Sequence, residues 1–364
     1  MKSGGMHHGS GRLAHTLVAV SLATALLGSS AGAQKLSARS PRPNEPSAED
    51  IQRVVDQAYA RFKNLREGKN ADYIPALAKV NPNLFGIALV TPEGQVYTAG
   101  DVTSEVSIQS VSKVFTMARV MQDSGETTIE KNMGVDATGQ PFNSIVAIEQ
   151  YKGHQMNPLV NAGAITTTSM IGGGSADAVW SNIINTLDEF AGRQLTVNEE
   201  VYKSEAATNQ RNQAIGALMF AYGHISANWQ QAVDLYTKQC SVNVNARDLA
   251  TMAATLANGG LNPVTGHQVV GSQHVPGILA VMATAGLYDD SGRWLYVTGL
   301  PAKSGVGGGL IAVSPDKFGI AVVSPPLDSA GNSVRGQKAI TEISAALHGN
   351  PYISQAHNMI AKKR

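Results

Sequence analysis

Stretches typical of β-strands lie toward both ends of this chain, and the long segment between them has helical periodicity. Residues 84–90 and 95–99 are short apolar runs joined by Thr91-Pro92-Glu93-Gly94, which predicts a β-hairpin. Further strands are predicted at residues 295–298, 309–313 and 318–324. Because both ends of the chain supply strands to one sheet, the segment between them must fold as an inserted region.

The inserted segment and both flanks of the sheet have the pattern of amphipathic helices. Residues 48–65 begin with a Ser-x-Glu-Asp sequence typical of a helix cap. The other predicted helices span residues 161–171, 176–190, 199–222, 227–236, 247–258 and 337–347. The expected fold is α/β: a mixed lobe with a mainly antiparallel sheet (48–130 and 270–364) and an inserted all-helical lobe (131–269). A ligand site is expected in the cleft between them.

The N-terminus has the layout of a secretory signal peptide. Lys2 and Arg12 precede an apolar run over residues 13–27, which is followed by Ala31-Gly32-Ala33. A membrane anchor is the alternative, but the run is shorter than the roughly 20 apolar residues of a spanning helix. We therefore expect a signal peptide over residues 1–33, a linker over residues 34–47, and a periplasmic or secreted protein.

Composition narrows the possible partners and cofactors. The 364 residues are 43% hydrophobic and carry a formal net charge of +1, which is unlike a nucleic-acid binder, so a small solute is expected instead. Cys240 is the only cysteine, so no disulfide can form within the chain, and we expect its thiol to be buried. The histidines lack zinc-site spacing and no phosphate-binding loop is present, so no metal and no cofactor are predicted.

Ser110-Val111-Ser112-Lys113 is the first candidate catalytic motif, at the start of a helix predicted over residues 111–121. A spacing of three places Ser110 and Lys113 on one helical face. A serine hydroxyl is a weak nucleophile until a base removes its proton, and a desolvated lysine with a lowered pKa can be that base. Ser314-Pro315-Asp316-Lys317 matches the same pattern, but its proline between two predicted strands indicates a turn.

Lys303-Ser304-Gly305 is the second candidate motif, placed where a strand would begin. It resembles the Lys-Thr-Gly strand of penicillin-recognising enzymes, which also carry Ser-x-x-Lys earlier in the chain. The glycines that follow allow a backbone N–H to approach a substrate closely, as an oxyanion hole requires.

A series of segments between about Asp72 and His348 resembles the serine-dependent glutaminase family. The segments are Asp72-Tyr73-Ile74-Pro75, Ser107-Ile108-Gln109-Ser110-Val111-Ser112-Lys113-Val114-Phe115, Asn157-Pro158-Leu159-Val160-Asn161-Ala162-Gly163-Ala164-Ile165, Ser204-Glu205 with Arg211-Asn212, Tyr236 with Gln239-Cys240-Ser241, Gly286-Leu287-Tyr288-Asp289, and Lys303-Ser304-Gly305-Val306-Gly307-Gly308-Gly309. The resemblance implies a β-lactamase/DD-peptidase-like fold, hydrolysis of L-glutamine to L-glutamate and ammonia, no cofactor, and a homodimer or homotetramer.

The resemblance also implies the catalytic roles. Ser110 would be the nucleophile, Lys113 its base and Tyr236 a proton relay beside them. The backbone N–H groups of Ser110 and Val306 would hold the oxyanion of the tetrahedral intermediate. Lys113 or Tyr236 would then protonate the departing ammonia, and water would hydrolyse the acyl-enzyme.

The substrate-binding residues follow from the same resemblance. Glu205 would face the ammonium group of glutamine. Its carboxylate and amide ends would be bound by the side chains of Tyr73, Asn161, Asn212 and Tyr288. Taken alone, each of these residues is more simply read as a buried hydrogen-bond partner, a helix cap or, for Glu205, a solvated helix face.

Gly134-Val135-Asp136-Ala137-Thr138-Gly139 departs from the Glu-Pro-Ser-Gly sequence typical of the family, which affects a loop rather than the catalytic residues. A β-lactamase or penicillin-binding peptidase is the main alternative, since it would share Ser110 and Lys113. Ser241-Val242-Asn243 resembles the Ser-x-Asn element of that class, but Glu205 has no role there. An amino-acid-binding protein without catalysis is the third hypothesis.

Overall fold

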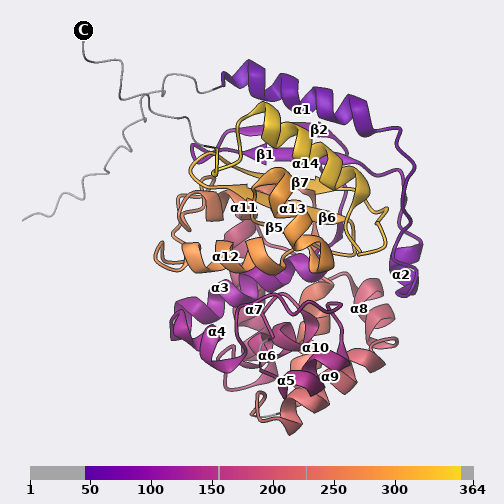
Figure 1. The fold of residues 1–364 in the computed structure, drawn as a ribbon, viewed down its shortest axis with the longest axis vertical. Coiled ribbons are helices and arrows are strands. Elements are labelled where there is room, and N and C mark those ends of the chain that lie inside the picture. Colours follow the sequence, from indigo (N-terminus) through magenta and orange to yellow (C-terminus); the bar gives the residue numbers. More distant parts are fainter. Residues whose placement is uncertain (1–45, 155, 227, 354–364) are drawn as a thin grey trace, which may run out of the picture. The chain divides into compact units, whose positions relative to one another are not determined.

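Strands from both ends of the chain form one antiparallel sheet. The computed structural model describes residues 46–154, 156–226 and 228–353. In this part of the chain the sheet has five strands in the order β2-β1-β7-β6-β5 (Figure 1). The strands are β1 (Gly86–Val90), β2 (Val96–Gly100), β5 (Ala302–Ser304), β6 (Gly309–Ser314) and β7 (Phe318–Val323). The predicted hairpin and the two strands predicted at 309–313 and 318–324 are confirmed.

The sheet is buried on both faces, which explains its nearly continuous apolar strands. Successive side chains of a strand point to opposite faces. Ile87 and Leu89 accordingly join the apolar cluster on one face, whereas Ala88 and Val90 join the cluster on the other. Ile87 is paired with Val322, so the N-terminal and C-terminal strands meet in the middle of the sheet.

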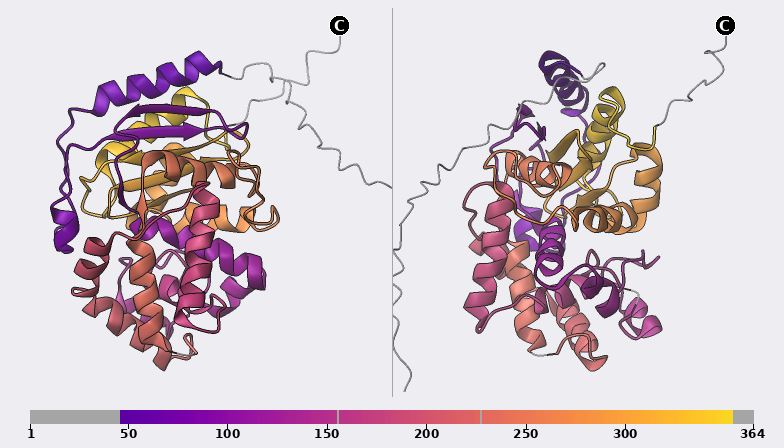
Figure 2. Two further views of the ribbon diagram at one scale, coloured as in Figure 1. Left: turned by 180° about the vertical axis from the view of Figure 1, so that it is seen from behind. Right: turned by 90° about the vertical axis from the view of Figure 1, so that its left-hand side faces the viewer.

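Three helices cover the two faces of the sheet. α1 (Ala48–Phe62) and α14 (Val334–Ala346) pack on one face, and α11 (Ala246–Ala257) packs on the other (Figures 1 and 2). The predicted cap of the first helix is confirmed, because the Ser47 hydroxyl accepts a hydrogen bond from the Asp50 N–H. Gly319 of β7 allows α11 to lie close, since a Cβ there would be 2.0 Å from the Ala254 nitrogen.

The remaining helices are α2 (Pro75–Ala78), α3 (Ser112–Ser124), α4 (Thr127–Asn132), α5 (Ile145–Tyr151), α6 (Asn161–Ser169), α7 (Ala176–Ala191), α8 (Glu199–Ala206), α9 (Gln210–Ala221), α10 (Trp229–Cys240), α12 (Val275–Ala285) and α13 (Ser291–Thr298). In the helical region α10 contacts α6, α7, α8 and α9, whereas α13 contacts α14 beside the sheet and α12 contacts α13 and β5. Two 3₁₀ turns, η1 (Gln109–Val111) and η2 (Tyr288–Asp290), and a short pair of strands, β3 (Val106–Ser107) and β4 (Asn243–Val244), complete the fold.

The strand predicted at 295–298 is wrong, because these residues end α13. Ser291, Trp294 and Thr298 are the buried positions of this helix, and their spacing of three and four is helical. Gly299 ends the helix with a φ of 70°, the left-handed conformation typical of a C-terminal cap. The apolar, β-branched run at 295–298 was too short to separate the two alternatives.

The single helix predicted at 199–222 is also wrong, because the chain breaks between α8 and α9. Thr208 lies in the break, and its hydroxyl donates to the Ser204 carbonyl, a local bond that competes with helix continuation. The break separates Glu205, at the end of α8, from Asn212 in the first turn of α9.

Other sequence predictions concern Cys240, the segment between β6 and β7, the N-terminus and the lobes. Cys240 is buried, as predicted, and residues 315–317 form a turn between β6 and β7. The predicted signal peptide (1–33) and most of the linker lie outside the described residues. The lobe boundaries stay a prediction, although α11, placed in the helical lobe from sequence, packs on the sheet.

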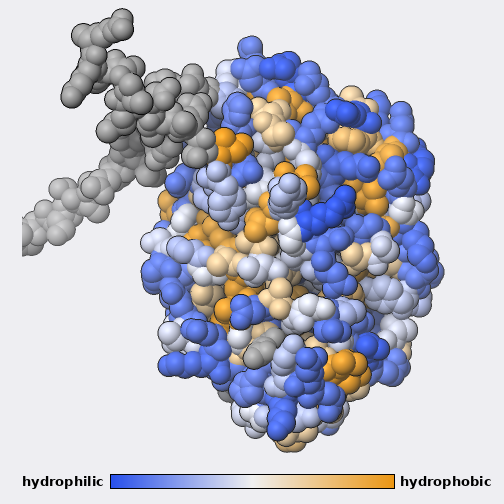
Figure 3. Space-filling view, in the orientation of Figure 1, coloured by the Kyte–Doolittle hydropathy of each residue, from blue (hydrophilic) through white to orange (hydrophobic). Residues whose placement is uncertain are grey.

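The described residues belong to one compact unit that begins at Pro46. No helix in the described ranges combines the length and the apolarity needed to span a membrane. The face in Figure 3 is mostly hydrophilic, with apolar residues in small scattered groups.

Candidate active site

Ser110 lies in the tight turn that joins β3 to α3. The chain is held just before this turn, because the Ile108 N–H donates to the Val242 carbonyl at 2.8 Å. Ser110 itself is buried, with 6% of its surface exposed. Gln109 has a φ of 48°, a left-handed conformation that is uncommon outside glycine. The candidate nucleophile therefore lies in a strained turn that is continuous with a helix.

Lys113 lies in the first turn of α3, with its ammonium group buried among neutral acceptors. Nζ donates to Asn161 Oδ1 at 2.7 Å and to the Leu159 carbonyl at 3.2 Å. Burial lowers the pKa of Lys113 to about 8, an effect that the charges of Cys240 and Glu205 partly oppose. Lys113 can therefore take up and release a proton close to neutral pH.

Tyr236 meets Lys113 at a shared acceptor. Its hydroxyl donates to Asn161 Oδ1 at 3.2 Å, and Lys113 Nζ lies 5.7 Å from the centre of its ring. Burial raises the pKa of Tyr236 well above its ordinary value, so the phenol keeps its proton. Lys113 and Tyr236, which sequence analysis placed at one site, thus bond to the same amide oxygen of Asn161.

Asn161 is the first residue of α6 and connects the catalytic candidates to the next helix. Its Nδ2 donates to Asn212 Oδ1 at 2.8 Å, and its backbone N–H donates to the Phe142 carbonyl at 2.8 Å. Beside it, Arg211 Nε donates to the Asn143 carbonyl at 2.8 Å. The loop before α5 is therefore bonded to α6 and α9, the helices that carry Asn161 and Asn212.

Glu205 is a buried carboxyl group at the C-terminal end of α8. Its Oε2 accepts a hydrogen bond from Gln109 Nε2 at 3.1 Å. Burial raises the pKa of Glu205 to about 7, while the hydrogen bond from Gln109 and the charge of Lys113 act in the opposite direction. A cationic ligand group in contact with this carboxyl would stabilise its ionised form.

Tyr288 lies in η2 with a φ of 54°, a second strained backbone position. Its hydroxyl donates to the Ser304 carbonyl at 3.3 Å. Burial raises the pKa of Tyr288 to about 12, and hydrogen bonds with Ser110 and Ser304 oppose this rise. The Phe142 ring packs against the Tyr288 ring at 4.7 Å. Tyr288 therefore reaches Ser110 from the side of the sheet.

Lys303 of β5 is fully buried and lies behind Tyr288. Its Nζ donates to the Gly286 and Ser304 carbonyls at 3.0 and 2.6 Å and lies 4.2 Å from the centre of the Tyr288 ring. Burial, with a smaller contribution from the charge of Lys113, lowers the pKa of Lys303 well below its ordinary value. The strand motif predicted from sequence thus supplies a buried amine next to Tyr288.

The glycine-rich segment after β5 passes against the Ser110 turn. A Cβ on Gly305 would lie 2.8 Å from the Ile108 carbonyl oxygen and 3.3 Å from the Ser110 nitrogen. A glycine is needed at this position because the two backbones approach so closely. Val306 follows and is buried in a small apolar cluster with Val201 and Leu327. Because Val306 directly follows Gly305, its backbone also lies near the Ser110 turn.

Tyr73 differs from the other predicted site residues because 55% of its surface is exposed. It precedes α2, and the Ala76 N–H of that helix donates to the Ser204 hydroxyl at 3.1 Å. This bond places the Tyr73 segment against α8, the helix that carries Glu205. Tyr73 is thus the exposed member of the predicted set.

Several contacts of the site had no predicted role. Gln109 bonds to Glu205, the Leu159 carbonyl accepts from Lys113, and Phe142 contacts both Asn161 and Tyr288. Gln109 and Leu159 lie inside the segments that resemble the family, so these segments were assigned to the site, but no role was predicted for the two residues. The Leu159 carbonyl and the φ angle of Gln109 are backbone features, and the identity of a residue does not predict them.

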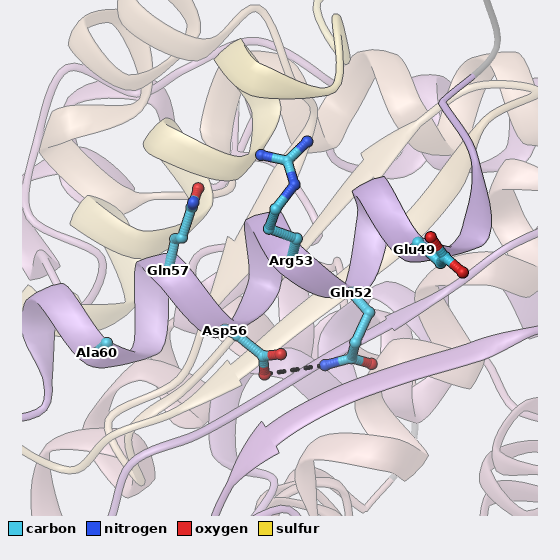
Figure 4. A pocket seen from close by; sticks show the side chains of 6 residues that line it. All are labelled: Glu49, Gln52, Arg53, Asp56, Gln57 and Ala60. Carbon is cyan, nitrogen blue, oxygen red and sulfur yellow. Dashed lines mark hydrogen bonds between the residues drawn. The ribbon is translucent and has the colours of Figure 1, made fainter.

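Two cavities show where open space lies. A depression of about 560 Å³ follows α1, where Figure 4 shows Arg53 and Gln57 on one side of the helix and Gln52 and Asp56 on the other. It contains none of the predicted site residues. A smaller cavity of about 160 Å³ lies between the loop that departs from the family pattern and η2, and its lining includes Tyr288.

Across the described part of the chain, no group of three or more His, Cys, Asp or Glu side chains is arranged to hold a metal ion.

The chain matches the glutaminase family model over residues 68–352. A glutaminase from Colwellia psychrerythraea is 53% identical over 305 residues, which cover 84% of this chain and 98% of that protein. Glutaminase 1 from Shigella flexneri is 47% identical over 305 residues, again 84% of this chain and 98% of the relative.

Solved structures agree with these sequence matches. The structure of ybaS, described as a probable glutaminase, superposes with a TM-score of 0.84 at 46% identity and covers 85% of this chain and 100% of its own. A Bacillus glutaminase superposes with a TM-score of 0.74 at 28% identity, with 83% of this chain and 99% of the other covered. The predicted β-lactamase/DD-peptidase-like α/β fold class is confirmed by this likeness. The chain therefore belongs to the glutaminase family.

Proposed function

We propose that this protein hydrolyses the side-chain amide of L-glutamine to L-glutamate and ammonia, with Ser110 as nucleophile and Lys113 as its base. The family membership supports the reaction. The observation that carries the mechanism is the environment of Lys113, whose buried Nζ contacts two neutral carbonyl oxygens, those of Asn161 and Leu159.

These two acceptors favour a neutral lysine with an oriented lone pair. A neutral amine has two N–H bonds and one lone pair, and the two acceptors use both N–H bonds. The lone pair is then free to accept the proton of Ser110, which lies on the same side of the turn at a spacing of three residues. A pKa of about 8 leaves roughly a tenth of Lys113 neutral at pH 7.

Acylation follows from this arrangement. Ser110 Oγ transfers its proton to Lys113 Nζ and attacks the amide carbon of glutamine. The negative charge on the former carbonyl oxygen is held by the N–H groups of Ser110 and Val306. As the C–N bond breaks, Lys113 or Tyr236 returns a proton to the departing nitrogen, and ammonia leaves.

Deacylation uses the same groups in reverse. Water donates a proton to Lys113 and attacks the ester carbon, which re-forms the oxyanion. When the C–Oγ bond breaks, Ser110 recovers its proton and L-glutamate is released. Where Tyr236 is the donor to the departing nitrogen, the proton that Lys113 took from Ser110 passes back to the Tyr236 oxygen, so the phenol is protonated again before water attacks, consistent with its raised pKa.

Recognition of free glutamine rests on Glu205. Its buried carboxylate pairs with the α-ammonium group, while Tyr73, Asn161, Asn212 and Tyr288 bind the carboxylate and amide ends. A pocket with fixed polar groups rejects ligands that lack their partners. Asparagine is one methylene shorter, which displaces its amide by about 1 Å from Ser110, enough to slow acylation strongly.

The substrate is tested by ammonia release from the chain beginning at Gln34, supplied in parallel with L-glutamine and L-asparagine, and by turnover of a chromogenic β-lactam. We expect rapid release from L-glutamine, slow release from L-asparagine and no β-lactam turnover. Turnover of the β-lactam without release from L-glutamine would identify a penicillin-recognising enzyme. Binding of L-glutamine without release would identify a binding protein.

We also propose export and self-association. The signal-like N-terminus supports cleavage after Ala33 and a periplasmic or secreted enzyme that scavenges external glutamine, and the resemblance supports a homodimer or homotetramer. N-terminal sequencing of the protein recovered from outside the cytoplasm should begin at Gln34. Light scattering of the purified chain should give two or four times the mass of one chain, and a single-chain mass would contradict the assembly.

A further inference from the structure

Ser112 is the serine of the Ser110–Lys113 motif that the proposed chemistry does not use. Its side chain is fully buried at the start of α3. The hydroxyl donates to the Gln109 carbonyl at 2.7 Å, a short bond between two residues on either side of Ser110. The Ser112 hydroxyl therefore closes the turn that presents the nucleophile.

This turn needs restraint because Gln109 is held in an unfavourable conformation. A φ of 48° places the Gln109 Cβ against its own carbonyl, and such conformations persist only when surrounding contacts impose them. The Gln109 side chain is held at its other end, where Nε2 donates to Glu205 Oε2 at 3.1 Å and to the Ser107 hydroxyl at 3.3 Å. The backbone carbonyl of Gln109 is held by the hydrogen bond from the Ser112 hydroxyl.

A buried amide orients the Ser112 hydroxyl from behind. Gln239 of α10 is fully buried, and its Nε2 donates to Ser112 Oγ at 3.4 Å. Its Oε1 accepts from the hydroxyls of Thr116 at 3.1 Å and Thr168 at 3.4 Å. Because Ser112 Oγ accepts from Gln239, its own proton is directed toward the Gln109 carbonyl.

We infer that Ser112 is a positioning residue for the reaction: its hydroxyl, oriented by Gln239, fixes the strained Gln109–Ser110 turn in the geometry that acylation requires. The inference rests on the proposed function, since it takes Ser110 as the nucleophile. The backbone N–H of Ser112 also donates to the Gln109 carbonyl, so removing the hydroxyl loosens the turn without abolishing it. The effect should therefore fall on kcat and be partial.

The sharpest test compares Ser112→Thr with Ser112→Val, because the two side chains have nearly the same volume and differ in the hydroxyl. Threonine in a helix can bond a carbonyl three or four residues earlier. We expect kcat for L-glutamine to be at least about tenfold higher in the threonine than in the valine variant, and KM to agree within about threefold. Ser112→Ala should lower kcat by a similar factor without adding volume.

Thr116→Val is the matched control one turn along α3. It removes another buried hydroxyl of α3, but one that does not contact Gln109, and Gln239 Oε1 keeps its hydrogen bond from Thr168. We expect a melting temperature as low as that of Ser112→Ala, with kcat within about twofold of the parent. Inhibition by the product L-glutamate should be unchanged in all variants, because binding does not depend on this hydroxyl.

Equal kcat in Ser112→Thr and Ser112→Val would overturn the inference, as would a fall in kcat for Thr116→Val equal to that for Ser112→Ala. The threonine and valine pair decides the question even where Ser112→Ala does not fold. A parent chain that releases no ammonia from L-glutamine would refute the proposed function before any variant is compared.

Discussion

At the scale of single residues, the carboxyl group of Glu205 has a proposed role in binding and is buried, which disfavours its ionised form. Burial raises the pKa of Glu205 from 4.5 to about 7, so the folded protein holds this proton over a pH range in which the unfolded chain has released it. The resulting stabilisation is full below pH 4.5 and is lost as the pH rises through about 7. A shift of this size corresponds to about 3 kcal/mol.

Glu205→Gln tests this account, because it keeps the shape and removes the ionisation. We expect the free energy of unfolding at pH 8 to rise by about 1–3 kcal/mol relative to the parent and to be unchanged near pH 4.5. The KM for L-glutamine should rise at least about tenfold, because its ammonium group loses a charged partner. Denaturant unfolding at the two pH values and steady-state kinetics provide the measurements. An equal gain at both pH values would indicate packing rather than charge.

The lowered pKa of Lys113 predicts a different pH dependence of stability and activity. Its folded pKa of about 8 lies below the ordinary 10.5, so the unfolded chain binds the extra proton between these values, and stability rises with pH across that window. The free-energy cost of burying the protonated amine of Lys113 is therefore fully present below pH 8. Because the neutral amine is the base, kcat/KM should rise with pH and level off only above about pH 8. A profile that is flat from pH 6 to pH 9 would exclude Lys113 as the base.

Lys113→Met separates activity from stability. Removing the base should lower kcat by at least about 1,000-fold. The melting temperature at pH 7 should stay equal to or exceed that of the parent, because methionine removes the cost of burying an amine. A large fall in melting temperature would mean that the hydrogen bonds to Asn161 and Leu159 stabilise the fold by more than burial of the amine destabilises it.

The residues alone predicted only part of the site. Ser110 and Lys113 followed from spacing and chemistry, whereas Asn161, Glu205 and Tyr288 were selected only through the family resemblance. Neither route predicted a role for Gln109, because its strain and its bond to Glu205 depend on how α8 and the Ser110 turn meet. Such contacts between distant segments leave no local pattern.

At the scale of elements, the errors share a physical cause. The hairpin β1–β2 has turn residues between two apolar runs, so local sequence was sufficient. Residues 295–298 are a short run of apolar and β-branched residues, and only burial at Ser291, Trp294 and Thr298 makes them helical. Tertiary packing, and not local propensity, determined the secondary structure of this segment.

The contact between β7 and α11 gives a prediction at this scale. Gly319→Ala would place a Cβ about 2.0 Å from the Ala254 nitrogen, so the helix must move away from the sheet. We expect destabilisation by about 2–3 kcal/mol or more, measured by denaturant unfolding. Gly292→Ala, in α13, is the control, because no atom lies within 4 Å of its added Cβ and alanine favours helix. Equal effects in the two variants would contradict the close approach.

At the scale of the whole molecule, strands from both chain ends form the centre of the sheet, as the sequence pattern predicted. The lobe boundaries stay a prediction. α11 belongs to the helical stretch in the sequence, yet it packs on the sheet. Its Asn245 and Asp248 form a capping box, a signal that marks where the helix begins but not what it packs against.

The compact unit that begins at Pro46 predicts the effect of truncation. A chain starting at Pro46 keeps the Ser47 cap of α1 and should match the chain starting at Gln34 in kcat and melting temperature. A chain starting at Ile51 loses that cap and should melt several degrees lower. A loss of activity on starting at Pro46 would show that residues 34–45 contribute to the folded enzyme.

The central claim is that Ser110 forms the acyl-enzyme, and ammonia release from L-glutamine by Ser110→Ala tests it most directly. The substitution removes one buried oxygen, so the variant should fold and bind L-glutamine as the parent does. We predict that its ammonia release falls to background while binding, followed by calorimetry, is retained. Release by correctly folded Ser110→Ala at a rate near that of the parent would contradict the account.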